Sequence, residues 1–292
     1  MSDHKALVRS PDSPGRGVYF LANDTVYDMA VAFLNSLRSN SRHLPLCWIP
    51  YDDRSQRIRE LADRYDFIEF RNNDVLRRCD ELSLQYHDDR CGAYRKLAMW
   101  SGPFEEFAYI DVDTVVVSDI SFAFDGLAHY DVLTSHSNIA RIRKWVWKKS
   151  IYDSALLNTE QIAYAANTGF IVSTRSFASF EQMTSGIEAG AAVKQHMTHK
   201  CKEQPALNYA IVTSGKRYGS ISEMVKKRLL RPAWCELHGS VRGWRVQGGQ
   251  ILNRNPFSSR QAFLVHWAGF RNPQTFPYQA LWQYYRDMDT PA

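Results

Sequence analysis

FAYIDVDTVVV, residues 107–117, is the stretch of the sequence that decides the fold. Its residues are apolar and prone to form strands, except for two carboxylates, Asp111 and Asp113. Such a run predicts a strand buried on both faces. Side chains two apart on a strand point the same way, so both carboxylates can offer oxygen ligands to one Mg²⁺ or Mn²⁺. Burying the pair without a cation would be unfavourable, so the stretch predicts a metal site.

Strand-like and helix-like segments alternate ahead of this stretch, which implies βαβ units and a mostly parallel sheet. The expected strands are residues 18–22, 45–49 and 67–70, and the expected helices are residues 29–37, 54–65 and 91–101. Ligands of open α/β sheets bind at the carboxyl ends of strands. The prediction is therefore an α/β fold with a single mixed, mostly parallel central sheet flanked by helices.

The second half of the chain has a mixed pattern. Its expected strands are residues 131–134, 169–173 and 262–267, and its expected helices are residues 177–189, 204–212 and 278–288. No linker-like segment divides the chain, so we expect one domain over residues 18–292, preceded by a flexible arm over residues 1–17. Asp287 and Asp289 repeat the paired-carboxylate spacing in a polar context, where we expect a solvated pair.

The composition is that of an ordinary globular protein, with 45% hydrophobic and 23% charged residues and a net charge of +5. The five cysteines are odd in number and form no CxxC pair, which argues against a disulfide framework and a zinc site. No apolar run is long enough for a membrane span or a signal peptide, so we expect a cytoplasmic protein. The basic residues carry no nucleic-acid-binding signature.

Residues 94–120 resemble the metal-binding stretch of glycogenin and other family 8 retaining glycosyltransferases. Further segments resemble that family in chain order: Ala22-Asn23-Asp24 is similar to its uracil-binding turn, Asn167-Thr168-Gly169-Phe170 to its Asn-x-Gly segment, Glu203-Gln204 to its Asp-Gln pair, and His266-Trp267-Ala268-Gly269 to its C-terminal His-x-x-Gly motif. The similarity spans roughly residues 18–273.

The resemblance implies a GT-A type nucleotide-sugar-binding fold, a UDP-sugar donor, Mn²⁺ or Mg²⁺, and hexose transfer with retention at the anomeric carbon. It implies that residues 18–135 bind the nucleotide sugar and that residues 136–292 form the acceptor and lid half. The implied metal ligands are Asp111, Asp113 and His266. The implied donor contacts are Ala22, Asn23, Asp24, Tyr27, Lys96, Asp111, Val112, Asp113, Gly269 and Arg271, and the implied catalytic residues are Asn167, Glu203 and Gln204.

Two positions depart from the family pattern. Glu203 is one methylene longer than the usual aspartate, and Asn272 stands where the family has a lysine, so we expect Arg271 to supply that cation. Residues 140–162 predict a basic, aromatic helix. Its role remains open between a lid over the donor and a surface helix that packs its tryptophans into the core. For single residues the plain alternatives are a core histidine at His266 and a surface lysine at Lys96.

Further plain alternatives are a helix cap at Asn167 and a solvated helix start at residues 203–204. Two other functions compete with this one. A sugar nucleotidyltransferase needs a Gly-rich phosphate loop, and residues 18–30 contain no glycine. A non-catalytic carbohydrate-binding protein of the same fold is the other alternative. The acceptor remains open among a glycan, a lipid carrier, a protein tyrosine and a small metabolite, and peripheral membrane contact and a homodimer remain open too.

Overall fold

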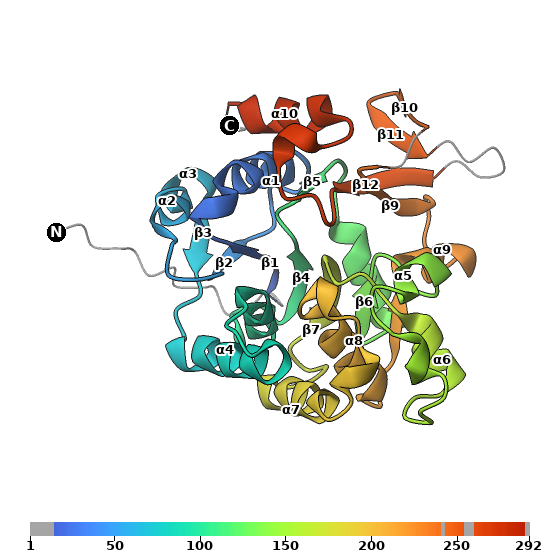
Figure 1. Cartoon of the computed structure of the whole chain (residues 1–292). Helices are drawn as coiled ribbons and strands as arrows, with labels where there is room; N and C mark the ends of the chain where they lie inside the picture. The colour runs from blue at the N-terminus through green and yellow to red at the C-terminus, as the bar shows by residue number, and fades with distance from the viewer. Residues whose placement is uncertain (1–14, 241–242, 254–259, 290–292) are drawn as a thin grey trace.

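The computed structural model describes residues 15–240, 243–253 and 260–289. A seven-stranded sheet in the order β3-β2-β1-β4-β7-β6-β8 forms its centre (Figure 1). These strands are β1 (Arg16–Ala22), β2 (Leu46–Pro50), β3 (Phe67–Glu69), β4 (Glu106–Ile110), β6 (Val132–Thr134), β7 (Phe170–Thr174) and β8 (Tyr218–Ser220). Only β7 runs antiparallel to its neighbours, which confirms the mixed, mostly parallel sheet.

Alternation along β1 explains why both faces of the sheet are covered. Val18 and Phe20 enter one hydrophobic core, whereas Tyr19 and Leu21 enter a second core on the other face. The first core contains α1 (Tyr27–Asn40) and the C-terminal α10 (Gln279–Asp287), which pack together (Figure 1). The second contains α4 (Asn73–His87), α7 (Phe180–Ala191) and α8 (Gln204–Thr213).

A second, smaller sheet lies beside the first and was not predicted. It has the order β10-β11-β12-β5, with β9 pairing parallel to β12. Its strands are β5 (Thr114–Val116), β9 (Trp234–His238), β10 (Trp244–Gln247), β11 (Gln250–Asn253) and β12 (Arg260–His266). The register pairs His266 at the end of β12 with Thr114 at the start of β5. This pairing brings His266 close to Asp111 and Asp113.

The expected strand over residues 107–117 is broken, so that part of the prediction is wrong. β4 ends at Ile110 and β5 begins at Thr114, and the chain passes from the large sheet to the small one between them. The backbone amide of Asp111 still donates to the carbonyl of Gly169, after which the chain turns to pair with β12. Asp111 and Asp113 therefore lie on a turn between two sheets, not on one face of a strand.

Three expected helices also differ. Residues 91–101 form the 3₁₀ helix η2 (Gly92–Ser101), and residues 54–65 form two short helices, α2 (Gln56–Arg59) and α3 (Ala62–Tyr65). The expected helix over residues 140–162 is wrong: that segment contains α5 (Ala140–Arg143), η4 (Lys149–Ile151) and the start of α6 (Thr159–Tyr164). The shorter elements are η1 (Asp24–Val26), η3 (Ser121–Ala128), η5 (Lys194–His196), η6 (His199–Cys201), α9 (Ile221–Lys226) and η7 (Pro273–Thr275).

Of the expected arm over residues 1–17, residues 1–14 lie outside the described residues, and Arg16 already opens β1. All five cysteines are free thiols, as predicted. Within the described ranges, no helix has both the length and the apolar character needed to cross a membrane.

Candidate functional site

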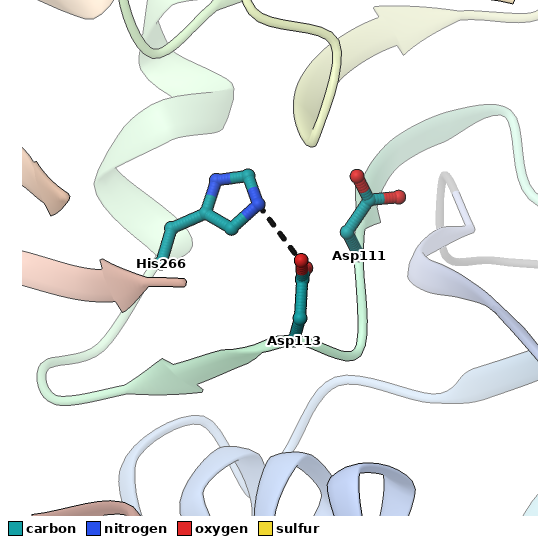
Figure 2. A group of neighbouring side chains, drawn as sticks. All are labelled: Asp111, Asp113 and His266. Atoms are coloured by element: carbon teal, nitrogen blue, oxygen red, sulfur yellow. Dashed lines mark ion pairs between the residues drawn. The ribbon is translucent and has the colours of Figure 1, made fainter. Parts of the chain in front are cut away.

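Asp111, Asp113 and His266 converge on one point, as Figure 2 shows. One ligand atom from each lies within 4.8 Å of the others. The two carboxylates come from the turn between β4 and β5, and the imidazole comes from the end of β12. Two carboxylate oxygens and one imidazole nitrogen form a donor set that suits Mn²⁺ or Mg²⁺.

The surroundings of His266 orient its ring. Its Nδ1 donates a hydrogen bond of 2.8 Å to Oε1 of Glu236, a buried residue of β9, and its Nε2 lies 3.1 Å from Oδ1 of Asp113. Burial raises the pKa of Glu236, but the adjacent His266 outweighs it and lowers the pKa to about 2. Burial lowers the pKa of His266, and Asp113 and Glu236 together raise it well above its usual value. His266 is therefore a buried histidine whose two ring nitrogens both face carboxylates, one of them the candidate metal ligand Asp113.

Two features fit these residues to a cation. Oδ1 of Asp113 is buried and accepts no hydrogen bond within the described part of the chain, although it lies in ion-pair contact with Nε2 of His266. Gly169 passes so close that a Cβ there would lie 2.3 Å from Cε1 of His266 and 2.9 Å from Oδ2 of Asp111. Only glycine leaves that space free, so the backbone of the Asn-x-Gly segment forms one wall of the metal site.

Lys96 links the metal site to the catalytic candidate Glu203. Its side chain is 2% exposed, and Nζ lies 2.7 Å from Oε1 of Glu203 and 3.3 Å from Oδ1 of Asp111. Nζ also donates to the carbonyl of Thr168. Burial lowers the pKa of Lys96, but Asp111 and Glu203 outweigh it and raise the pKa. The surface-lysine alternative is wrong, and so is a solvated Glu203.

A cavity of about 460 Å³ opens beside these residues. Among its walls are eight predicted site residues: Ala22, Asn23, Lys96, Asp111, Val112, Asp113, Glu203 and Arg271. Its size falls in the range of small-molecule sites. Further wall residues were not predicted from the sequence, among them Tyr51, Arg54 and Phe270. They come from loops after β2 and β12, where only the fold shows that they meet the cavity.

Within the predicted uracil-binding turn, some residues line the cavity and others hold neighbouring structure in place. Asn23 is buried at the cavity wall; its Nδ2 donates to Oδ2 of Asp52, and its Oδ1 accepts from the backbone amide of Thr25. Asp24 and Tyr27 do not line the cavity. Oδ1 of Asp24 accepts from the amide of Ile58, so this carboxylate anchors α2.

The amide-bearing candidates shape the turn next to the candidate metal ligands. Oδ1 of Asn167 accepts from the backbone amide of Gly169 at 2.8 Å, which is not a helix cap. At the start of α8, Gln204 accepts from the amide of Thr168 at 3.4 Å, and its Nε2 lies 3.5 Å from the carbonyl oxygen of Trp145. Gly269 has a φ of +86°, which favours glycine, and it leads the chain into the wall residues Phe270 and Arg271.

A larger cavity of about 890 Å³ lies next to this one and shares no residue with its walls. It contains none of the predicted site residues. Many of its charges neutralise one another, as in the pairs of Arg59 with Glu69 and of Arg95 with Asp80. We therefore place the chemistry in the smaller cavity, beside the metal candidates.

Glu236 is the functional candidate that the sequence analysis missed. It lies within WCELH, residues 234–238, where it is one carboxylate in an otherwise mostly apolar strand. The same signal, a carboxylate inside a buried strand, had drawn attention to residues 111–113. Here it had no second carboxylate and no family motif beside it.

The fold is that of the GT-A glycosyltransferases. Among solved structures, the chain is similar to the bifunctional glycosyltransferase WbbM, with 13% identity over 97% of this chain and 51% of that one and a TM-score of 0.63. It is similar to the galactosyltransferase LgtC, solved with donor and acceptor sugar analogues, with 12% identity over 94% of this chain and 97% of that one and a TM-score of 0.61.

The chain also resembles mouse xyloside xylosyltransferase 1, with 12% identity over 76% of this chain and 87% of that one and a TM-score of 0.51. It spans about half the length of WbbM. No protein-family model matches the sequence, and no curated protein matches it. At these identities the similarity concerns the fold.

Proposed function

We propose that this protein is a metal-dependent retaining glycosyltransferase that transfers a hexose from a UDP-sugar to an acceptor hydroxyl. One observation carries the proposal: Asp111, Asp113 and His266 converge at a cavity that also presents Asn23 and the buried pair of Lys96 with Glu203. This combination offers a cation site, a polar turn for a base and a charged pocket for a sugar.

Asp111, Asp113 and His266 would hold a divalent cation, Mn²⁺ or Mg²⁺. Once bound, it would neutralise the negative charge that grows on the departing diphosphate. Hydrogen bonds from Tyr109 to Asp111, at 2.6 Å, and from His266 to Glu236 fix two of these ligands before a donor arrives. Fixed ligands of this kind reduce the reorganisation that the reaction requires.

The remaining residues divide the donor between them. Asn23 faces the base, Arg271 the diphosphate, and Glu203 and Lys96 the transferred hexose. Since Oε1 of Glu203 is already engaged by Lys96, we assign Glu203 to holding sugar hydroxyls rather than to nucleophilic attack. Asn167 and Gln204 support the backbone wall at residues 168–169 and complete the catalytic set.

The configuration at the anomeric carbon is retained because the acceptor attacks the face of the sugar from which the diphosphate leaves. The bond between the anomeric carbon and the diphosphate oxygen breaks, and a bond from the acceptor oxygen to that carbon forms on the same side. The acceptor's proton passes to an oxygen of the departing phosphate, so no protein base is required. Residues 18–135 supply the contacts to the uracil and two metal ligands in this scheme, whereas residues 136–292 supply His266, Glu203 and the acceptor side. Free thiols suit a reducing compartment, so we place this activity in the cytoplasm.

Calorimetric titration of UDP with and without Mn²⁺, on wild type and on Asp113→Asn, tests the proposal. We expect UDP binding that needs the metal and is lost in the variant, followed by hydrolysis of at least one UDP-sugar in a donor screen. If the affinity for UDP is the same with and without Mn²⁺, and the same in wild type and Asp113→Asn, the metal assignment is refuted. Binding of another nucleotide in place of UDP would refute the base assignment at Asn23.

A further inference from the structure

Two basic segments lie side by side next to the proposed catalytic residues. Residues 141–149 contain five Lys or Arg side chains, residues 194–202 contain three, and neither segment has an Asp or a Glu. We call these two segments the basic surface. The amide of Lys148 donates to the carbonyl of His196, the amide of Thr198 donates to that of Val146, and Trp147 bridges Met197. These backbone contacts join them into one face.

The cations of the basic surface are not paired with carboxylates of the described residues. None of its eight Lys and Arg side chains forms an ion pair with a described residue, whereas Arg16, Arg95, Arg175 and Arg217 elsewhere each pair with a carboxylate. Their field acts on His199 within the same surface: burial lowers the pKa of His199, and the charge of Lys148 lowers it further. An uncompensated cluster of this kind attracts anions.

The basic surface lies next to Glu203, at the proposed sugar end of the cavity, although none of its residues lines the cavity. Lys202 directly precedes the wall residue Glu203, and its backbone is held at a φ of +50°, which is rare outside glycine. On the other segment, the carbonyl of Trp145 lies 3.5 Å from Nε2 of Gln204. Neither segment contributes to the walls around Asn23 or Arg271, where the nucleotide is proposed to bind.

An exposed aromatic stands among these cations. The indole of Trp145 is 42% exposed, and Nζ of Lys144 lies 5.4 Å from the centre of its ring. Sugar rings pack on such faces through their apolar C–H groups, and the flanking cations suit charged substituents. The segment is broken into α5 and η4, so it lacks the long amphipathic helix of a membrane-surface anchor.

We infer that the basic surface binds anionic groups, phosphate, sulfate or carboxylate, on the saccharide that accepts the sugar. This inference rests on the proposed function and narrows its acceptor to an acidic glycan. Trp145 would support a ring of that glycan next to Gln204, and Lys148, Lys200 and Lys202 would contact its charges.

Calorimetric titration with sucrose octasulfate, and with sucrose as its neutral counterpart, tests the inference on protein saturated with UDP and Mn²⁺. Wild type should bind the sulfated sugar and not sucrose. The double reversal Lys148→Glu with Lys200→Glu should weaken that binding by about tenfold, since attraction becomes repulsion at two sites.

The matched control is Arg42→Glu with Lys216→Glu, which changes the net charge equally. Both positions are exposed and precede β2 and β8, at the sheet edge opposite the metal site. We expect the control to bind as wild type does. Equal weakening in both variants would show a general charge effect and overturn the inference, as would no binding by wild type.

Two further measurements separate this inference from its alternatives. If the basic-surface variant loses binding to phosphatidylglycerol vesicles but keeps its affinity for the sulfated sugar, the surface is a membrane contact and the inference is wrong. UDP titration with Mn²⁺ is run on every variant first. Normal UDP binding with no selectivity for the sulfated sugar would overturn the acceptor inference alone, whereas absent UDP binding in wild type would overturn the proposed function and the inference together.

Discussion

Glu236 accepts a hydrogen bond of 2.8 Å from Nδ1 of His266 and thereby fixes which ring nitrogen faces Asp111 and Asp113. Carboxylates in this position orient metal-binding histidines, and their loss typically weakens metal affinity about 10-fold to 100-fold. We therefore predict that Glu236→Ala lowers Mn²⁺ affinity by this amount, as measured by calorimetry. Glu236→Gln keeps an acceptor and should lose less.

The control for this prediction is Glu181→Gln, which removes a carboxylate from exposed α7. It should bind Mn²⁺ as wild type does. Thermal unfolding without metal separates a folding defect from a ligand defect. A Glu236→Ala protein that folds and binds Mn²⁺ normally would show that the ring needs no such support.

The contrast between residues 107–117 and Glu236 shows how far the sequence could predict the site. Two carboxylates in an apolar run are a local signal, so this pair stands out as a candidate metal site without knowledge of the fold. The break at residues 111–113 could not, because apolar residues on both sides favour a strand. The turn is set by distant partners, namely the Gly169 carbonyl and β12.

The structure of residues 140–162 could not be predicted from local sequence either. Their spacing of basic and aromatic residues fits a helix, yet contacts with residues 194–202 divide the segment into short pieces. Tertiary contacts of this kind override local propensity. The parallel sheet was predicted well because strand and helix patterns alternate along the chain itself, whereas the second sheet joins strands from distant parts of the sequence.

Gly169 should tolerate no side chain. A Cβ at this position would lie 2.3 Å from Cε1 of His266, so Gly169→Ala must displace the histidine or the turn. We predict that Mn²⁺-dependent UDP binding is lost while the protein remains folded. Gly219→Ala is the control, since its Cβ would press on the ring of Tyr130, away from the metal residues. It should reduce thermal stability and leave Mn²⁺-dependent UDP binding intact.

Asp52 should support UDP binding through Asn23. Oδ2 of Asp52 accepts a hydrogen bond of 2.9 Å from Nδ2 of Asn23. We predict that Asp52→Ala weakens UDP binding several-fold because the Asn23 side chain loses its anchor. Asp53→Ala, at the exposed neighbouring position, is the matched control and should bind UDP normally. Equal affinities for the two variants would mean that Asn23 needs no anchor.

The pH dependence of this contact follows from the charge of Asp52. Burial raises its pKa, but hydrogen bonds from Arg54 and Asn23 outweigh burial and bring the pKa below the usual 3.8. A carboxyl with a lowered folded-state pKa contributes stability above its unfolded value, and that stability is lost as the pH falls through the folded value. The difference in free energy of unfolding between wild type and Asp52→Asn should therefore stay constant from about pH 5 to pH 8. It should shrink only in acid, as urea unfolding at several pH values can show.

Lys96 should hold two carboxylates together in the absence of a metal. Removing one partner of a buried ion pair leaves an uncompensated charge, so we predict that Lys96→Met lowers the free energy of unfolding by about 3 kcal/mol. Adding Glu203→Gln should restore part of that loss, because the stranded carboxylate is then gone. Lys216→Met, at an exposed position, should change stability little. Additive effects of Lys96→Met and Glu203→Gln in urea unfolding would contradict the pairing.

The family 8 resemblance leads one to expect a lysine at position 272, where this chain has Asn272. Substitution of Arg271 tests whether this neighbouring residue supplies the missing cation. Asn272 has a structural task, since its Oδ1 accepts from the amide of Gln274 and caps η7. The exposed Arg271 lines the cavity instead. We predict that Arg271→Ala weakens UDP binding about tenfold, the usual effect of losing one charge-assisted contact to phosphate. Arg271→Lys should keep much of the affinity for UDP. Raising the salt concentration should reduce the difference in UDP affinity between wild type and Arg271→Ala. If Asn272→Lys tightens UDP binding while Arg271→Ala leaves it unchanged, the cation belongs at position 272 and the replacement has not occurred.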